Sequence, residues 1–489
     1  MSAPQSIVVV GGGTAGWMAV NLFMHAWPST KVTLVESSDI GIIGVGEGAT
    51  PYLKTFFARL GISESEWMPA CDASYKVGIS FENWSGRADY AEYFHPFFSA
   101  LDKPSANMFF HNCGVRRRGG DAYTRPNDFF ITGVLAQQKK SPLLTSNQGE
   151  IDYAYHFDSG KLGQFLKEKA LAKGLTHIVD NVIDISCDTQ VGISAVGTQK
   201  HGQLTAELYI DCTGFSAKLI HQTLKQEYVS YADNLLNNAA VAIQTPNQAN
   251  AALPVQTRSV ALTNGWMWHI PLASRQGNGY VYSNQHISAN EAECELRSAL
   301  GVSEQADIKV KHLNMRIGRL QQHWHKNCLA VGLAQGFIEP LEATALMLTQ
   351  LTIDQFIDAY SQPQQANQYK VFNQHINTVF DGVRDYIVAH YQLSQRSDSQ
   401  YWRDNQHNTH VPQVLSEIRE AWLSGTDVEQ VLTQHTRQLV YLRPSWYCIL
   451  AGMGVFPRVN TSQAQQNTNA VPLHQVRQYT DQVIQQHFS

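Results

Sequence analysis

The sequence predicts an α/β fold with a mainly helical C-terminal part, and three observations lead to this prediction. An apolar strand at 7–10 runs into a glycine turn and an apolar helix, and a second strand follows at 31–35. A helix and short strands alternate again over 160–215. From about residue 340 onward the pattern is helical and rich in glutamine. Strands alternating with helices are typical of βαβ units in a parallel sheet.

Composition limits the class of protein. At roughly 100–200 residues per domain, 489 residues allow two or three structural units. With 43% hydrophobic and only 16% charged residues, the chain is neither disordered nor a coiled coil. Thirty-six basic and 41 acidic residues give a net charge of −5, which disfavours nucleic acid as a partner.

Three features predict a cytoplasmic protein. The first residues show no basic leader or cleavage site of a secretory signal. The apolar run Tyr447–Phe456 is about half of the ~20 residues needed to span a bilayer, so no membrane contact is expected. The seven cysteines never form a CxxC pair, which disfavours a disulfide framework and a zinc site, and we expect no metal.

The glycine turn carries the clearest site motif. Gly11-Gly12-Gly13-Thr14-Ala15-Gly16 fits GxGxxG directly after the strand 7–10. The first glycine permits the tight turn, the second lets the backbone approach a pyrophosphate, and the third allows close helix–strand packing. Glu36 follows twenty residues beyond Gly16, where a carboxylate holds ribose hydroxyls. We therefore expect all seven residues to bind a dinucleotide.

A second motif decides which dinucleotide. The strand 206–211 ends in Asp211-Cys212-Thr213-Gly214, a pattern typical of FAD-binding, monooxygenase-like (GR2-type) α/β box domains. We expect Asp211 and Gly214, with Val182 at the end of the strand near 177–182, to bind FAD. A second complete GxGxxG is not evident, so the protein either binds NAD(P)H transiently or receives reduced flavin from another protein.

The expected domains are discontinuous. The FAD-binding domain covers 1–345, with a substrate-side insertion at about 70–150, and a helical substrate-covering subdomain covers 346–489. Locally, we expect a helix at 160–174, a surface connection at 235–255 and a solvated loop at 116–118. Asn278-Gly279 is expected to form the turn of a hairpin.

The strand 264–271 contains the pattern WxWxIP. Period-2 alternation puts Trp266, Trp268 and Ile270 on one face. Such a wall beside a flavin could keep a substrate away from the reactive ring. Spacing alone also allows a packed aromatic core strand.

Four segments together resemble the flavin-dependent tryptophan halogenase family: 11–17, 44–48, 266–271 and 336–342. The resemblance implies FAD used as FADH2 and a helical cover over the substrate. It also implies that Trp266, Trp268 and Ile270 form a tunnel wall and that four further residues lie near the flavin, namely Glu47, Gly48, Leu333 and Leu346.

Lys76 and Glu342 match the family's catalytic lysine and active-site glutamate. Lys76 is expected on a strand 74–81, on the face opposite Tyr75, Val77, Ile79 and Phe81, and could hydrogen-bond hypohalous acid or form a haloamine. Glu342 is expected to start a helix that continues over 341–351 and to stabilise the arenium intermediate. The backbone of Thr344 and Ala345 is expected to bind halide, although family members commonly have Ser and Gly at positions 343 and 345, where this chain has alanine.

The resemblance implies a reaction. The C4a-hydroperoxide of FAD and chloride or bromide give hypohalous acid, which migrates to Lys76 and halogenates an indole or another electron-rich aromatic. The implied partners are oxygen and a separate NAD(P)H-dependent flavin reductase. The expected substrate-side residues are His95, Phe97, Trp446 and Tyr447. An FAD-dependent aromatic hydroxylase and an inactive flavin-binding relative stay open as alternatives, and so does the oligomeric state, a homodimer included.

Overall fold

The computed structural model describes residues 3–39, 41, 47–145, 150–362, 367–457 and 469–488. The chain forms two compact units, each built from three stretches of sequence. Unit 1 comprises Met1–Ala73, Phe157–Ala232 and Met315–Phe380, and unit 2 comprises Ser74–His156, Asp233–Asn314 and Asp381–Ser489. Among the described residues, we find no helix long and apolar enough to cross a bilayer.

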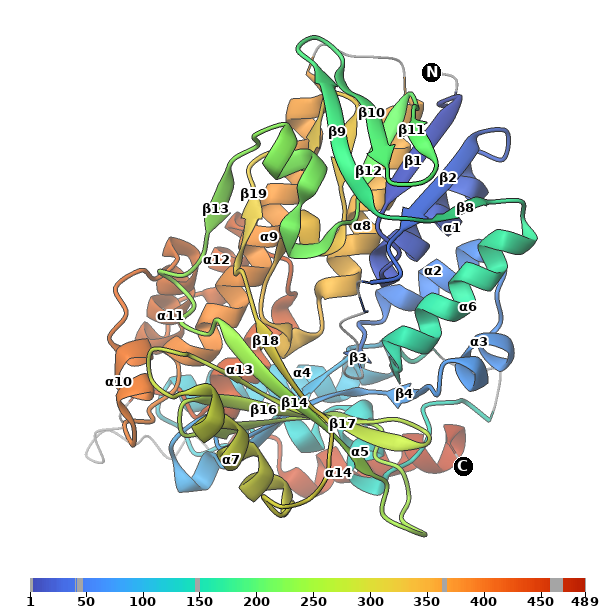
Figure 1. Cartoon of the computed structure of the whole chain (residues 1–489). Helices are drawn as coiled ribbons and strands as arrows, with labels where there is room; N and C mark the ends of the chain where they lie inside the picture. Colours follow the sequence, from blue (N-terminus) through green and yellow to red (C-terminus); the bar gives the residue numbers. More distant parts are fainter. Residues whose placement is uncertain are drawn as a thin grey trace. The chain divides into compact units, whose positions relative to one another are not determined.

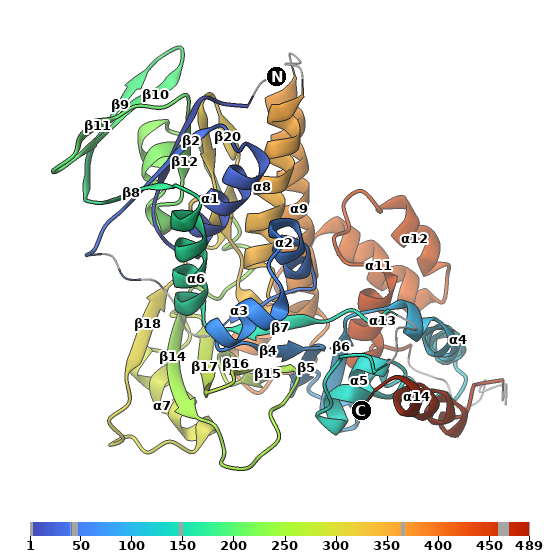
Figure 2. The same cartoon turned by 90° about the vertical axis from the view of Figure 1, so that its right-hand side faces the viewer.

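Unit 1 is organised around a six-stranded sheet in the order β20-β21-β12-β1-β2-β8. The strand β1 lies between β12 and β2 (Figure 1). It is an almost continuous β-branched run, as expected for a parallel strand buried on both faces. The helix α1 contacts both α6 and α8 (Figure 2). The unit confirms the predicted α/β class.

The helices and strands of unit 1 have the following bounds: β1 Ser6–Val10, α1 Thr14–Ala26, β2 Lys31–Glu36, β3 Glu47–Gly48, α2 Tyr52–Leu60, α3 Glu64–Ala70, α6 Ser159–Ala172, β8 Thr176–Val179, β9 Val182–Asp188, β10 Gly192–Thr198, β11 Gly202–Leu204, β12 Leu208–Asp211, β13 Tyr228–Ser230, β19 Gly318–Leu320, β20 Trp324–His325, β21 Cys328–Ala330, β22 Gly336–Phe337 and α8 Ala345–Ser361. Helix α9, Gln368–Gln392, begins in unit 1 and ends in unit 2.

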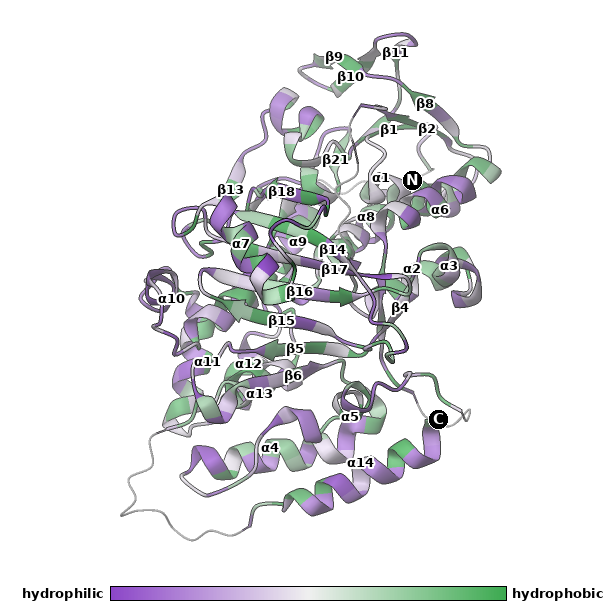
Figure 3. Cartoon of the chain, turned by 60° about the horizontal axis from the view of Figure 1, so that its bottom comes forward, coloured by the Kyte–Doolittle hydropathy of each residue, from purple (hydrophilic) through white to green (hydrophobic). Residues whose placement is uncertain are grey.

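Unit 2 is organised around a seven-stranded sheet in the order β18-β14-β17-β16-β15-β5-β6. One face packs against α7 through Met267, Tyr280 and Leu296. Elsewhere in the unit, α14 contacts α4 and α5, and its Val483 and Ile484 share an apolar cluster with residues of α5. The remaining surface of α14 is largely hydrophilic (Figure 3).

The helices and strands of unit 2 have the following bounds: β4 Ser74–Lys76, β5 Gly78–Glu82, β6 Glu92–Pro96, α4 Lys103–Arg117, α5 Ile131–Gln138, β7 Ala154–Phe157, β14 Ala239–Pro246, β15 Thr257–Leu262, β16 Gly265–Pro271, β17 Arg275–Tyr282, α7 Ala289–Leu300, β18 Val310–Asn314, α10 Gln400–Gln406, α11 Gln413–Ser424, α12 Val428–Gln434, α13 Arg443–Gly452 and α14 Leu473–His487.

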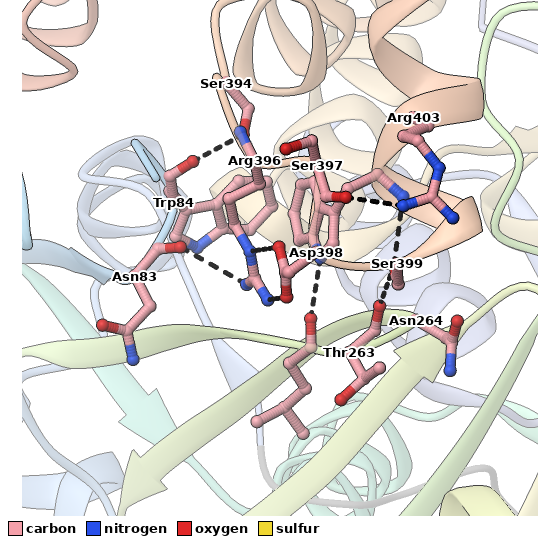
Figure 4. A network of polar contacts seen from close by, with 12 residues as sticks. Asn83, Trp84, Thr263, Asn264, Ser394, Arg396, Ser397, Asp398, Ser399 and Arg403 are labelled. Carbon is pink, nitrogen blue, oxygen red and sulfur yellow. Dashed lines mark hydrogen bonds and ion pairs between the residues drawn. The ribbon is translucent and has the colours of Figure 1, made fainter. Parts of the chain in front are cut away.

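A polar clamp ties the segment 394–403 to the sheet of unit 2 (Figure 4). Arg396 forms an ion pair with Asp398 at 2.6 Å and donates to the carbonyl of Asn83 at 3.3 Å. Ser399 donates to the carbonyl of Thr263, between β15 and β16. The hydrogen bonds to Asn83 and Thr263 link residues more than 130 positions apart in the chain.

Three local predictions are wrong. Residues 239–246 form the interior strand β14 rather than a surface connection, because the run Ala-Ala-Val-Ala-Ile is apolar enough to be buried between β17 and β18. Asn278 and Gly279 lie inside β17 and form no hairpin turn. Arg117 is buried in the last turn of α4, where its guanidinium donates to the carbonyls of Ala421, Trp422 and Thr426.

The compact units do not coincide with the expected domains. The strand β16, which contains WxWxIP, belongs to unit 2 together with the residues around Lys76. Helix α8, which begins at the expected boundary of 345, belongs to unit 1. The domain boundaries predicted from the sequence stay a prediction.

Candidate active site

Three parallel strands of unit 1 end side by side. Val10 lies opposite both Val35 and Asp211, so β1, β2 and β12 finish at the same level. Gly11 donates to the carbonyl of Val35 at 2.9 Å, and Cys212 donates to that of Val10 at 2.9 Å. Ligands of open α/β sheets bind at this carboxyl edge.

Three of the four glycines in the turn leave no room for a Cβ, and the fourth borders open space. Gly11 has a φ of +113°, and a Cβ there would lie 2.2 Å from the carbonyl oxygen of Cys212. A Cβ on Gly16 would lie 2.0 Å from the oxygen of Gly11, and one on Gly12 would overlap the carboxylate of Glu36. A Cβ on Gly13 would meet no protein atom within 4 Å. The turn thus keeps open space at the N-terminus of α1, which fits a pyrophosphate.

Lys167 and His177, which the glycine motif does not contain, hold the carboxylate of Glu36 in place. Its Oε1 accepts hydrogen bonds from Lys167 Nζ at 3.0 Å and His177 Nε2 at 2.8 Å. The His177 ring lies 5.5 Å from the ring of Trp17 on α1. Lys167 and His177 come from α6 and β8, and sequence reasoning missed them because nothing in their local pattern marks a site.

Asp211 organises the loop that follows β12. Its Oδ1 accepts from the backbone and hydroxyl of Thr213, and its Oδ2 accepts from the backbone of Leu219 and Ile220, all within 3.0 Å. A carboxylate accepts about four hydrogen bonds, and the protein supplies four here. Burial raises the pKa of Asp211, opposed by these donors. The carboxylate therefore fixes the loop at Gly214, whose φ is +66°.

Further expected residues lie near the glycine turn. A Cβ on Gly332 would lie 2.5 Å from the Cβ of Ala15, which brings the 3-10 helix Gly332–Ala334, and with it Leu333, next to α1. Val182 begins β9 two residues after Asp180, whose N–H donates to the carbonyl of Glu36.

Glu47 also lies in unit 1, beside the N-terminal end of α6. Burial and the charge of Asp158 raise its pKa to about 7, while a hydrogen bond with Ser159 acts in the opposite direction. The hydroxyl of Thr14 donates to the carbonyl of Ser159 at 3.4 Å. Gly48 follows in β3, and Gly44–Gly46 of the expected motif lie outside the described residues.

The Glu342 segment is a tight turn and does not start the expected helix. Pro340–Glu342 form a 3-10 turn, and Ala343 has a φ of +57°, which breaks the path before α8 begins at Ala345. Glu342 is buried, with 5% of its surface exposed. Thr344 is the N-cap of α8, so the N–H groups of Ala345 and Leu346 lie in a first turn that has no intrahelical acceptors.

Lys76 is fully buried in unit 2. The expected continuous strand 74–81 is interrupted at Val77: β4 pairs with β7, while β5 belongs to the seven-stranded sheet. The ammonium of Lys76 lies 5.4 Å from the ring centre of Phe97. Lys76 and Val77 are both completely buried, so neither side of the segment faces solvent at this point, and the predicted alternation of faces stays a prediction.

One face of the seven-stranded sheet carries the residues of the WxWxIP wall. Trp266, Trp268 and Ile270 alternate along β16, all three are buried, and the two indole rings lie 6.2 Å apart. The register puts Ser259 of β15 and Gly279 of β17 on either side of Trp268.

The substrate-side residues divide into two groups. His95, on β6, lies 5.7 Å from the ring of Tyr386, which meets Trp446 edge-on at 5.0 Å. Tyr441 stacks on Tyr386 at 3.8 Å. Tyr447 instead donates to Glu429 at 2.6 Å on another side of α13. Sequence reasoning missed both Tyr386 and Tyr441. The one local signal for Tyr386 is its position one turn before His390 on α9.

The chain matches the tryptophan halogenase family model over residues 6–469. It is 37% identical to the tryptophan 6-halogenase of Streptomyces toxytricini over 477 residues, which cover 92% of this chain and 90% of that one. It is 32% identical to the tryptophan 7-halogenase of Lentzea aerocolonigenes over 482 residues, covering 93% and 90%.

Solved structures agree with these matches. The crystal structure of the Streptomyces toxytricini enzyme superposes with a TM-score of 0.85 at 34% identity, covering 99% of this chain and 98% of that one. A flavin-dependent halogenase from Xanthomonas campestris superposes with a TM-score of 0.85 at 30% identity, covering 99% and 94%.

The glycine turn at the carboxyl edge of a mainly parallel sheet, together with these matches, defines a flavin-dependent enzyme. The chain belongs to the tryptophan halogenase family, as the motifs predicted, and it is a flavin-dependent halogenase. A hydroxylase and an inactive relative are not favoured.

Proposed function

We propose that the enzyme uses FAD, reduced by a separate NAD(P)H-dependent reductase, with oxygen and chloride or bromide, to halogenate an indole or another electron-rich aromatic. The observation that carries this proposal is the complete burial of Lys76 beside Phe97. A lysine ammonium is costly to bury unless it serves a partner or a reaction. The relatives are named tryptophan 6- and 7-halogenases, so tryptophan heads the substrate panel.

The residues of unit 1 support the dinucleotide form of the flavin. The open space at Gly13 fits a pyrophosphate, and Glu36 is placed for a ribose. Asp211 would act through Gly214, while Val182, Glu47, Gly48, Leu333 and Leu346 would line the flavin. Reduced FAD, when bound, would supply two of the four electrons that reduce oxygen, and halide would supply the other two as it is oxidised to hypohalous acid, with water as the second product.

The chain's residues then direct the halogen. Thr344 and Ala345 would hold halide through backbone N–H groups, and Trp266, Trp268 and Ile270 would keep the substrate from the flavin. Lys76 would present the electrophilic halogen to a ring held by His95, Phe97 and Trp446. Tyr447 would support this arrangement from another side of α13. The ring carbon gains halogen and loses its proton, and the hydroxide of hypohalous acid leaves with that proton as water. Glu342 would stabilise the cationic ring in between.

The seven cysteines are all free, which supports a reducing compartment such as the cytoplasm.

The test is reconstitution. The purified protein is mixed with FAD, NADH, an unrelated flavin reductase, bromide or chloride, and a panel of tryptophan, indole and substituted indoles. Mass spectrometry should detect halogenated products that require the reductase and halide. Hydroxylated products without halogen, or rapid reduction of flavin by NAD(P)H in the protein alone, would contradict the proposal.

A further inference from the structure

The strand β4, which carries Lys76, is held at both ends by hydrogen bonds to the seven-stranded sheet or its connecting segments. It has only three residues, Ser74–Lys76. On the C-terminal side, Val77 donates to the carbonyl of Val255 at 2.7 Å and accepts from Phe97 at 3.2 Å. The N-terminal side has its own connection, which passes through His156 of β7, the residue opposite Ser74.

That connection is a chain of three side-chain hydrogen bonds. Ser74 Oγ donates to the carbonyl of Pro271, at the end of β16, at 2.6 Å. Because a hydroxyl has one proton, the 3.2 Å contact between His156 Nδ1 and Ser74 Oγ requires Nδ1–H to donate. His156 Nε2 is then the acceptor, and Thr257 Oγ1 donates to it at 2.9 Å. These partners define one neutral tautomer.

The surroundings keep the imidazole in this form. His156 is fully buried, and Ser74 and Thr257 are buried as well. Burial first, and then the charges of Lys76 and His269, hold the pKa of His156 well below its usual value. A neutral imidazole can serve as donor on one side and acceptor on the other, whereas an imidazolium would accept no hydrogen bond from Thr257 and would be repelled by Lys76.

We propose that His156 is a positioning residue for Lys76: through Nδ1–H and Ser74 it fixes β4 to the end of β16 and so sets where the ammonium stands. This inference rests on the proposed role of Lys76 in halogen transfer. It assigns His156 no contact with substrate or flavin. The bond through Ser74 is the essential one, because Ser74 lies on the same strand as Lys76, two residues away.

Two substitutions separate the two sides of the ring. In His156→Asn the amide NH2 replaces Nδ1–H toward Ser74, while in His156→Gln the longer amide replaces Nε2 toward Thr257. Ser74→Ala removes the acceptor on the β4 side, and Thr257→Val, the matched control, removes the donor on the far side. All four are compared with wild type as the full chain, after thermal unfolding has shown which are folded.

The decisive activity readout is the ratio of halogenated product to FADH2 oxidised, measured with reductase, bromide and the substrate that wild type accepts. We expect His156→Gln and Ser74→Ala to lower this ratio by about 10–100-fold, as misplacement of a reacting group by ~1 Å does. His156→Asn and Thr257→Val should stay within about threefold of wild type, and the rate of FADH2 oxidation should change little in any variant.

Amide hydrogen exchange gives a readout independent of activity. The amides of Ser74–Lys76 should exchange faster in His156→Gln and Ser74→Ala than in His156→Asn. A wild-type protein that makes no halogenated product would refute the proposed function, while the exchange data would still test the link to β4. If wild type halogenates and His156→Gln keeps both ratio and protection, or if oxidation and halogenation fall together with stability, the positioning role is overturned.

Discussion

Gly279 of β17 lies directly opposite Trp268 of β16, and a Cβ on Gly279 would lie 2.1 Å from Cζ2 of the indole. The missing side chain therefore provides the space in which the Trp268 ring lies. The dipeptide Asn278-Gly279, which by itself indicates a turn, thus lies inside a sheet, where Gly279 leaves room for the indole ring.

This relationship predicts the effect of Gly279→Ala. The indole must move, which should destabilise the protein by about 1–3 kcal/mol and raise the fraction of FADH2 oxidised without halogenation. Urea unfolding and product analysis measure both. Trp268→Phe removes the ring atoms in conflict, so the double variant should recover part of the lost stability. Additive losses in the double variant would show that the two residues do not compete for space.

The glycine turn predicts a contrast between two alanine variants. Gly13 has a φ of −72° and open space where a Cβ would go, so Gly13→Ala should keep the thermal stability of the flavin-free protein and weaken FAD binding at least about tenfold. Gly16→Ala should lower stability without flavin, because its Cβ would meet the carbonyl oxygen of Gly11. Fluorescence titration with FAD and thermal unfolding distinguish them. Wild-type affinity in folded Gly13→Ala would contradict the pyrophosphate assignment.

Glu47 predicts a pH dependence of stability. Its pKa is about 7 in the folded protein against an ordinary value of 4.5, so the folded state binds more protons between these values. The stability of the flavin-free protein should therefore fall, through this group, as pH rises from 4.5 to about 7.

The matching experiment is urea unfolding of Glu47→Gln at several pH values. The variant should equal wild type near pH 4.5 and exceed it by about 1–3 kcal/mol above pH 7, because its amide is never charged. The exposed Glu168→Gln serves as the control and should show no such crossover. A constant difference across pH would contradict the raised pKa of Glu47.

We expect Lys76→Met to abolish halogenation while FADH2 is still reoxidised. Methionine keeps most of the volume of the buried side chain but has no ammonium to hold or carry the halogen. Product by mass spectrometry should disappear, while FADH2 reoxidation followed by stopped flow should stay within about twofold of wild type. Lys161→Met, on an exposed lysine, is the control. Halogenation at the wild-type rate would remove Lys76 from the mechanism.

We expect Glu342→Gln to lower the rate of halogenation without abolishing it. The amide keeps the shape of the buried carboxyl and an acceptor atom but loses the negative charge that would stabilise a cationic ring. We expect the rate of halogenation to fall by about 10²–10³, as when one electrostatic partner of a transition state is removed. Single-turnover measurements with preformed reduced flavin isolate this step. An unchanged rate would leave the carboxylate with a structural role in the turn before α8.

Local signals predicted a large part of the fold, including the strand, turn and helix at its start. The strand β1, the glycine turn and α1 are contiguous, so their periodicity and glycine spacing describe them without help from distant residues. The helical pattern after residue 340 is equally local, although Ala343 delays the start of α8. The lysine and aromatic motifs identified the family because short segments recur together in order.

Long-range pairing decided the rest. The segment 74–81 alternates like one strand, but β4 and β5 separate at Val77 because each finds a partner from a different part of the chain, β7 in one case and β6 with β15 in the other. The contacts of Lys167 and His177 with Glu36 span more than 130 residues. Such contacts leave no trace in a short window of sequence.

The sequence by itself therefore determined the class of protein, the glycine turn and the segments that carry Lys76, Glu342 and the two tryptophans, because each depends on neighbouring residues. Only the tertiary structure decided that Lys76 is completely buried, that Gly279 makes room for Trp268 and that His156 connects Ser74 to Thr257. The physical reason is that burial and side-chain hydrogen bonds are set by strands that meet only after the chain has folded.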